Sequence, residues 1–472
     1  MGQKTRQHII NKQDYHKFSL YCSSFMKRHE VSKTKHYVLA LVLGGSISVS
    51  ALAQNLKSIT ETSAVSEKKA SAKVFTLDEC INEAVKNNLA LRNADNQIAM
   101  SNEQRKEAYT KYFPTVSATG GGFISNQGLL QMSMGDQSLS LAKNGIVAGV
   151  TAMQPVFAGG QIINGNKMAK VGEDVSRLQR NLSENDVRLN TENYYWQAVM
   201  LKEKLKTLDQ VDKQLVSVEK DAQAAVDAGI RNRNDLLQVR LRKNETRTSR
   251  IQVENSLHTV CDMLAQVMGH AGETIDVQSS VSTPENTQQY YLSPESALPQ
   301  TNEYQLLDKQ IEANKLQYKL SVGKNLPSVA VGAGYLYNNV MDKSQNNLIG
   351  MLTVSVPISS WWGGSHDMKR QKIQVANSLN EKQDKSELLM VKMHKAWNDM
   401  NDAFKQVDIA KESIEQSEEN LRLNTDYYQA GTATISDLLD AQTLYQQSRD
   451  KYVESITNYE VKKREYLQAT GR

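Results

Sequence analysis

Carboxylates at two corresponding places in the chain have the types and spacing that best suit a chemical role. Asp235 follows Gly229 by six residues, and Asp437 follows Gly431 by the same interval, with Asp440 three residues further on. Side chains three residues apart share one face of a helix, so copies of this pair in an oligomer would form an acidic ring, which attracts cations. Asp near a helix start is also a common capping residue, and capping remains the alternative role for Asp235 and Asp437.

Histidines and glycine-rich segments give weaker candidates. The four histidines beyond residue 53 are scattered without metal-ligand spacing: His258, His270, His366 and His394. The run from Gly160 to Lys167 superficially resembles a phosphate-binding loop, but Asn166 precedes the lysine and Met168 stands where Ser or Thr is required. We therefore expect no enzyme activity, no cofactor and no metal site.

The first 53 residues have the pattern of a targeting segment, with an apolar run over residues 37–43 and a small-residue end at 51–53. Basic residues precede the run: Lys27, Arg28, Lys33 and Lys35. We predict a cleavable signal peptide over residues 1–53, in which the polar stretch before Met26 reflects a start site assigned too far upstream. A polar linker over residues 54–73 is predicted to follow. A membrane anchor is the alternative for the apolar run.

The net charge of +4 belongs to this targeting segment. It holds eight Lys and Arg against two Asp and Glu, so removing it from totals of 56 and 52 leaves 48 basic and 50 acidic residues. No basic excess remains to favour nucleic acid as a partner. Cys22 precedes the apolar run and follows Tyr21, which argues against a lipid anchor. Cys80 and Cys261 remain, either as buried free thiols or as one disulfide.

Landmarks recur in the same order in two halves of the chain, which indicates an internal repeat. Residues 91–121 align without gaps with residues 304–334 at a shift of 213, and the Ala-Gly and Asp-Leu-Leu motifs of 228–237 recur in 430–439 at a shift of 202. Each half reads as helix, strand, loop, strand, very long helix, tight break and helix. The chain accordingly divides into a first repeat (74–271), a linker (272–296) and a second repeat (297–472).

Two segments in each repeat show the alternation of β-strands. Residues 328–337 and 348–356 alternate clearly, and their counterparts near 114–122 and 145–154 alternate less cleanly. Each is about 9 to 11 residues long, as a tilted strand needs to cross a bilayer. Prolines are predicted to mark strand entry and tyrosines an aromatic girdle: Pro114, Pro327, Pro155 and Pro357, and Tyr335 and Tyr337. One face of a soluble antiparallel sheet is the alternative.

Four strands are too few to close a membrane barrel, because the smallest barrels use about eight. An open sheet edge in lipid would leave backbone groups without partners. If these strands enter a membrane, the protomer must therefore share its barrel with copies of itself.

The helical segments are unusually long. No proline interrupts the 67 residues from Gln161 to Asp227, which as one helix would reach about 100 Å. Apolar residues recur there and in residues 393–421 at steps of three and four, which is typical of coiled-coil seams. Gly229 and Gly431 supply the permissive backbone at which such a helix ends and the chain turns.

The duplicated pattern resembles the TolC family of bacterial outer-membrane efflux channels. The resemblance covers residues 76–471 and rests on the prolines before the strands, on the motifs 155–160 and 357–364, and on the two tips at 228–237 and 428–440. It implies a mainly α fold with a membrane β-barrel, in which duplicated long coiled-coil helix pairs accompany four strands per protomer. It also implies a homotrimer that closes one twelve-stranded barrel and an α-helical periplasmic tunnel.

The resemblance further implies the exit duct of a tripartite efflux or type I secretion system in the outer membrane, with outer-membrane lipid around it. The expected partners are a periplasmic adaptor protein and an inner-membrane pump or ABC transporter. The gate of that family matches tip residues Tyr428, Asp437, Asp440 and Asp235, with tip turns at Gly229 and Gly431. Some members carry an arginine two residues after the second tip glycine. Here that position is Ala433, and Arg231 and Arg233 are the cations available instead.

A periplasmic structural coiled-coil or adaptor protein without a channel is the alternative from another class. It would explain the helical seams but not the four duplicated strands. The cargo is not encoded in a recognisable motif, since a smooth tunnel need not bind what passes through it.

Overall fold

The computed structural model describes residues 73–126, 130–134, 137–141, 144–279, 281–340, 343–358 and 360–472. The predicted signal peptide and the predicted linker up to residue 72 lie outside the described residues. All of the elements below belong to one compact unit, Ser71–Arg472.

Four antiparallel strands form the main sheet, in the order β2-β5-β7-β8. They are β2 (Thr115–Ile124), β5 (Asn144–Ala158), β7 (Ser328–Val340) and β8 (Lys343–Ser355). The four predicted strands are therefore confirmed. Three of them, with 15, 13 and 13 residues, are longer than expected, because backbone pairing continues past the apolar alternation into polar residues such as Asn339 and Gln345. A hairpin of β3 (Leu130–Met134) and β4 (Gln137–Leu141) between β2 and β5 was not predicted.

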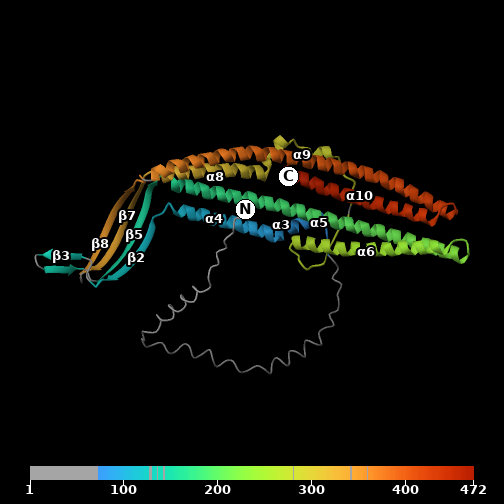
Figure 1. Cartoon of the computed structure of the whole chain (residues 1–472), viewed down its shortest axis with the longest axis horizontal. Coiled ribbons are helices and arrows are strands. Elements are labelled where there is room, and N and C mark those ends of the chain that lie inside the picture. Colours follow the sequence, from blue (N-terminus) through green and yellow to red (C-terminus); the bar gives the residue numbers. More distant parts are fainter. Residues whose placement is uncertain are drawn as a thin grey trace, which may run out of the picture. The chain divides into compact units, whose positions relative to one another are not determined.

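Each strand of the sheet is connected to a helix, which precedes β2 and β7 and follows β5 and β8 (Figure 1). Helix α4 (Leu89–Thr110) leads into β2, and α8 (Asn302–Lys324) leads into β7. Helix α5 (Gln161–Asp227) leaves β5, and α9 (Ser360–Gln429) leaves β8. With 67 and 70 residues, α5 and α9 are each about 100 Å long, as predicted for the first of them.

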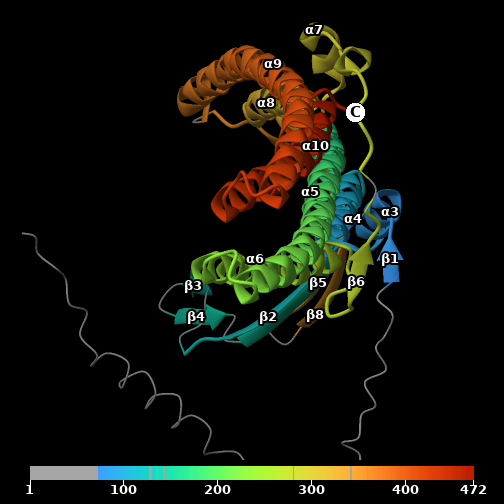
Figure 2. The same ribbon diagram turned by 90° about the vertical axis from the view of Figure 1, so that its right-hand side faces the viewer.

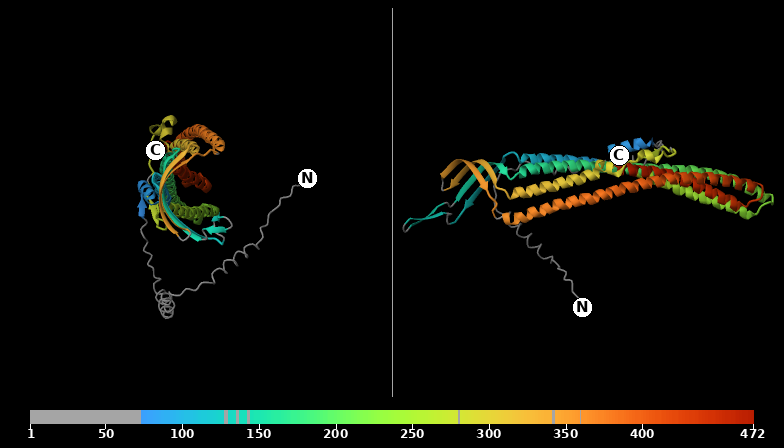
Figure 3. Two further views of the ribbon diagram at one scale, coloured as in Figure 1. Left: turned by 90° about the vertical axis from the view of Figure 1, so that its left-hand side faces the viewer. Right: turned by 90° about the horizontal axis from the view of Figure 1, so that it is seen from above.

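Return helices complete two long hairpins. Helix α6 (Arg233–Val267) packs along α5, and α10 (Ile435–Ala469) packs along α9 and also contacts α5. These four helices lie in a curved layer when viewed along their length (Figure 2). The sheet is curved as well (Figure 3).

The helix and strand ends recur at the two shifts of the predicted internal repeat. Both ends of α6, at 233 and 267, fall on the ends of α10, at 435 and 469, with the shift of 202. The first residues of β2 and β7, Thr115 and Ser328, differ by the other shift of 213. The two shifts thus relate matching elements of the two halves.

The predicted linker 272–296 contains short elements and packs against the helices. Strand β6 (Ile275–Val277) pairs in parallel with β1 (Lys73–Phe75), and η1 (Thr287–Tyr290) follows. Helix α7 (Pro294–Ala297) begins in the linker, and η2 (Leu298–Gln300) lies just beyond it. The β1–β6 pair joins α3 (Leu77–Asn87) in a core cluster against α5 and α6. A linker defined by composition therefore still contributes apolar side chains to the core.

Cys80 and Cys261 are free thiols in that same cluster. Burial raises the pKa of Cys80 to about 12 and that of Cys261 to about 11. Of the two alternatives left open by the sequence, the structure has the buried free thiols.

None of the helices in the described residues is both long enough and apolar enough to cross a bilayer.

Candidate functional site: the helical tips and the apolar sheet face

Both long helices end in the same backbone motif at the tip. Gly229 and Gly431 have φ angles of 70° and 78°, in the left-handed region that favours glycine. The amide of Ile230 donates to the carbonyl of Ala225, and the amide of Thr432 donates to that of Tyr427. Together with bonds from the glycine amides, this is the Schellman arrangement that closes a helix C-terminus. The structure thus places both glycines at the tip turns.

An apolar cluster holds the two tips of one protomer together. Its buried members come from all four hairpin helices except α9, and are Val211, Leu215, Ala222, Leu236, Val239, Ile435, Leu438 and Leu439. Helix α9 adds two partly buried side chains, Leu421 and Tyr428. The tips are therefore packed against each other, and any separation of the hairpins must expose this cluster.

Asp437 caps helix α10. Its carboxylate accepts hydrogen bonds from the backbone and side chain of Thr434 at 2.9 and 2.7 Å, while its own amide donates to the Thr434 hydroxyl. The hydrogen bonds from the Thr434 side chain and then its backbone hold the pKa of Asp437 below its ordinary value. The capping alternative is thus realised within the protomer.

Asp440 and Asp235 occupy different settings. Asp440 is exposed and lies three residues beyond Asp437. Leu438 and Leu439 between them are buried, so both carboxylates lie on the solvent-exposed face of α10. Asp235 is in the first turn of α6 and is half-buried. Burial raises the pKa of Tyr428, and the carboxylate of Asp235 adds to this rise, whereas Arg231 opposes it.

Arg231 connects the two tips. Its guanidinium lies over the ring of Tyr428, with 4.9 Å from its carbon to the ring centroid, and one nitrogen donates to the Tyr428 carbonyl at 3.4 Å. Both residues are half-buried. The neighbouring Arg233 is exposed, and no hydrogen bond or ion pair of its side chain occurs among the described residues. Of the two candidate cations, only Arg231 contacts a predicted gate residue, and Ala433 contributes a backbone bond to Tyr427.

The register of the sheet separates an apolar face from a mixed one. Paired residues share a face, so Val116, Ala152, Ala333 and Gly350 stand in one row across all four strands. Many of the large apolar side chains on this face are at least 43% exposed, among them Val116, Ile146, Val150, Val331, Tyr335, Leu348, Leu352 and Val354. We call it the apolar sheet face.

The opposite face of the sheet is mixed. It carries Thr115, Ser117, Thr119, Thr151, Thr353 and Ser355, together with Val147, Ile349 and Met351. Ser117 and Thr151 are within hydrogen-bond distance, at 3.0 Å, across β2 and β5. An exposed apolar patch opposite a more polar one marks a surface that meets a membrane or a partner.

The predicted strand prolines have two different positions. Pro114 and Pro327 immediately precede β2 and β7, at strand entry as predicted. Pro155 and Pro357 instead stand at strand exits. Pro155 is inside β5 beside a bulge, where a residue without an N–H is tolerated, and Pro357 follows β8.

Aromatic residues lie at both ends of the sheet. Tyr335 and Tyr337 are on the apolar sheet face toward the loop end of β7. The helix end has further exposed aromatic side chains that the sequence reasoning missed: Tyr109, Tyr112, Phe113, Trp361 and Trp362. A usable signal was present, since three aromatic residues fall within 109–113 in a chain that is only 6% aromatic.

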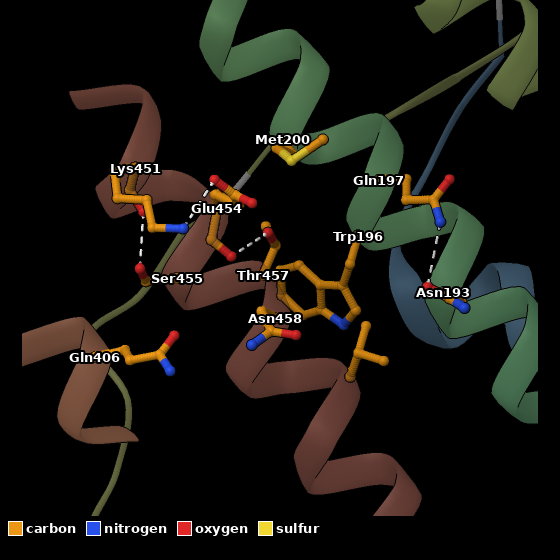
Figure 4. Close-up of a pocket in the computed structure, with 11 residues that line it drawn as sticks. Asn193, Trp196, Gln197, Met200, Gln406, Lys451, Glu454, Ser455, Thr457 and Asn458 are labelled. Carbon is orange, nitrogen blue, oxygen red and sulfur yellow. Dashed lines mark hydrogen bonds and ion pairs between the residues drawn. The ribbon is translucent and has the colours of Figure 1, made fainter. Parts of the chain in front are cut away.

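A cavity of about 200 Å³ lies where α5, α9 and α10 meet (Figure 4). Trp196 of α5 points toward α10, and its buried indole nitrogen has no hydrogen-bond partner in the structure. Lys451 and Glu454 on α10 form an ion pair at 3.3 Å. No group of three or more His, Cys, Asp or Glu side chains in the described part of the chain is arranged to hold a metal ion.

Comparison with known protein families decides what this architecture is. The family model described as outer membrane efflux protein matches residues 80–270 and 295–472. The chain belongs to the outer membrane efflux protein family. The match includes both repeats with their strands and hairpins, so the alternative of a periplasmic coiled-coil or adaptor protein is wrong. As a family member, the protein is an outer-membrane efflux channel that extends into the periplasm, as the resemblance implied.

Solved structures of outer-membrane channels share the fold of this efflux protein. The outer membrane protein VceC of Vibrio cholerae has a TM-score of 0.72 at 12% identity, covering 84% of this chain and 96% of VceC. The CmeC channel of Campylobacter jejuni has a TM-score of 0.67 at 13% identity, covering 84% and 85%. The open state of the MtrE channel of Neisseria gonorrhoeae has a TM-score of 0.66 at 13% identity, covering 84% and 88%. A search of curated protein sequences finds no match.

Proposed function

We propose that three copies of this efflux protein close one twelve-stranded barrel in the outer membrane, continued by a helical tunnel across the periplasm. The observation that carries the proposal is the sheet: within the described residues, β2 and β8 each pair along one side only. In lipid, such edges require strand partners. Strands β2 and β8 of neighbouring copies supply them, and the apolar sheet face meets the acyl chains.

The mixed sheet face then lines the barrel. It carries most of the sheet's hydroxyl side chains, such as Thr115, Thr151 and Thr353. Membrane barrels have this distribution, with apolar side chains outside and polar ones inside. The tyrosines Tyr335 and Tyr337 form part of the aromatic girdle at the loop end of the barrel.

The tips form the gate of the proposed channel. Three copies of Asp437 and Asp440 make an acidic constriction, and Asp235 adds charge at the first tip of each protomer. Arg231 acts as the lock by holding the first tip to Tyr428 of the second. The contacts that close this gate therefore differ from those of family members that carry an arginine at the position of Ala433. Opening moves the two hairpins of a protomer apart and exposes the apolar cluster between them.

The partners of the channel are a periplasmic adaptor and an inner-membrane pump or ABC transporter. The two tips lie about 100 Å from the sheet along α5 and α9, which supports contact with components beyond the outer membrane. The channel is a passive conduit for drugs, small molecules or exported proteins, and selection of cargo resides in the pump.

Detergent extraction, native mass spectrometry and planar-bilayer recording of the mature protein test this proposal together. The expected result is a protein that resists urea extraction from outer membranes, has the mass of three protomers and conducts ions. A urea-extractable monomer without conductance would overturn it.

A further inference from the structure

A basic cavity lies beside the apolar sheet face at the helix end of the sheet. It has a volume of about 520 Å³ and lies between α4 and α5. Helix α4 leads into β2, and α5 follows β5 (Figure 1). Four basic side chains and two tyrosines line it: Arg105, Lys106, Lys167, Lys170, Tyr109 and Tyr112. None of the lining residues is acidic.

The cavity opens on the same side as the apolar sheet face. A second cavity, of about 560 Å³, flanks the same α4–α5 seam and is lined by Thr115, Pro155 and Ala158, which stand on the mixed face of the sheet. The seam between the two cavities is closed by Asn166, which donates to the carbonyl of Ala108. The basic cavity therefore belongs to the opposite side, where Gln154, which shares the apolar sheet face with Val331, donates to the carbonyl of Tyr112.

Two of the four cations are available for a ligand. Arg105 forms an ion pair with Glu173 at 2.9 Å, and Lys106 forms one with Glu103 at 2.7 Å. Lys167 and Lys170 are exposed, one turn apart on α5, and have no ion-pair partner among the described residues. Their charges add to those of Arg105 and Lys106, which Glu173 and Glu103 partly neutralise, and the net positive field suits an anion at the mouth of the cavity.

We propose that this cavity binds the headgroup phosphate of an anionic glycerophospholipid in the membrane leaflet nearest the helices. Lys167 and Lys170 contact the phosphate, Tyr109 and Tyr112 lie at headgroup depth, and the acyl chains extend along Val116 and the apolar sheet face. Aromatic and basic side chains at this depth are a recurring combination for holding lipids. The inference rests on the proposed membrane insertion of the sheet.

Continuity with the apolar sheet face favours a lipid over free phosphate. A free phosphate ion would need only the lysines, whereas Tyr109 and Tyr112 also line this cavity and Phe113 packs on Tyr109, and these three side chains are 58, 41 and 56% exposed. Such apolar surface is costly in water but not beside acyl chains. A phospholipid contacts both, with its phosphate at the lysines and its acyl chains beside the aromatic side chains.

Native mass spectrometry of the purified channel tests the inference, with phosphatidylglycerol and phosphatidylcholine supplied as competing probes. The variant combines Lys167→Gln with Lys170→Gln, and a second variant restores the charges as Lys167→Arg with Lys170→Arg. Lys111→Gln is the matched control, because Lys111 lines the other cavity at the same end of the helices. A basic residue near an anionic membrane surface is worth about 1 kcal/mol, so losing two lowers phosphatidylglycerol retention about 30-fold.

The expected result is selective retention of phosphatidylglycerol by the parent, the arginine variant and the Lys111 control, but not by the glutamine variant. Equal retention by the parent and the glutamine variant overturns the inference, as does displacement by inorganic phosphate without lipid retention. An oligomer that becomes unstable in the glutamine variant while lipid retention is unchanged also overturns the inference, because a neighbouring copy of the chain would then occupy the cavity. Conductance of the same preparations separates this failure from failure of the channel itself.

Discussion

The contact between Arg231 and Tyr428 leads to the most specific prediction about the gate. Arg231→Gln removes the cation over the ring and the charged donor to the Tyr428 carbonyl. At partly exposed sites, a cation–π contact is worth about 0.5–1 kcal/mol, and the 3.4 Å hydrogen bond adds little because it is long. Losing about 1 kcal/mol per protomer shifts the closed–open equilibrium about fivefold, and three coupled protomers shift it about 150-fold.

Single-channel recording in planar bilayers measures this shift as open probability. Arg233→Gln is the matched control, because it removes the same charge from the same tip without losing a described contact. Arg231→Lys keeps a cation near the ring and is expected to retain much of the closure, and Tyr428→Leu is expected to match Arg231→Gln. Equal open probabilities for the Arg231→Gln and Arg233→Gln channels would refute the role of Arg231 as the lock and assign any effect to net charge alone.

Three further predictions follow from the tips and the helix seam. Gly431→Val has free space for its side chain, but the left-handed backbone at this position costs a β-branched residue about 1–2 kcal/mol. The Gly431→Val assembly is therefore expected to dissociate at a lower temperature than the Gly431→Asn assembly, and identical dissociation temperatures would argue against the tip turn. Asp437→Asn with Asp440→Asn is expected to weaken cation selectivity and block by multivalent cations in bilayer recordings, and unaltered selectivity would remove both residues from the constriction. Burial raises the pKa of Asp450 to about 6, so ionisation opposes folding and stability falls as pH rises from about 4 to 6. Asp450→Asn should therefore gain about 1–2 kcal/mol at pH 7.5, after allowance for solvent screening, and nothing below pH 4; a gain independent of pH would show another cause.

Much of the fold was accessible from the sequence because the repeat and the breaks fix element ends. Helix α5 has the predicted bounds, since glycines at 159–160 and 229 adopt left-handed backbone at its two ends and no proline interrupts it. Pairing of β1 with β6 was not predicted. These strands have three residues each and lie about 200 residues apart, so neither carries a detectable alternation.

The candidate site was predictable by position but not by contact. Gly229, Gly431 and the three aspartates lie at the tips because a turn between helices requires permissive backbone and favours acidic residues at the next helix start. That Arg231 rather than Arg233 meets Tyr428 depends on how two hairpins pack, across 197 positions in the sequence. The apolar sheet face also needed the register, because the first-repeat strands alternate weakly on their own.

Cross-linking between sheet edges tests the shared barrel most directly. With Cys80 and Cys261 replaced by alanine, Ser117→Cys on β2 is combined in turn with a cysteine at Ile349, Met351 or Thr353 on β8. In outer membranes, oxidation of one such combination is predicted to yield a covalent trimer on denaturing gels, while each single-cysteine control remains a monomer. Only monomers across the scan, from protein that is folded and membrane-inserted, would contradict the closure of one barrel by three copies.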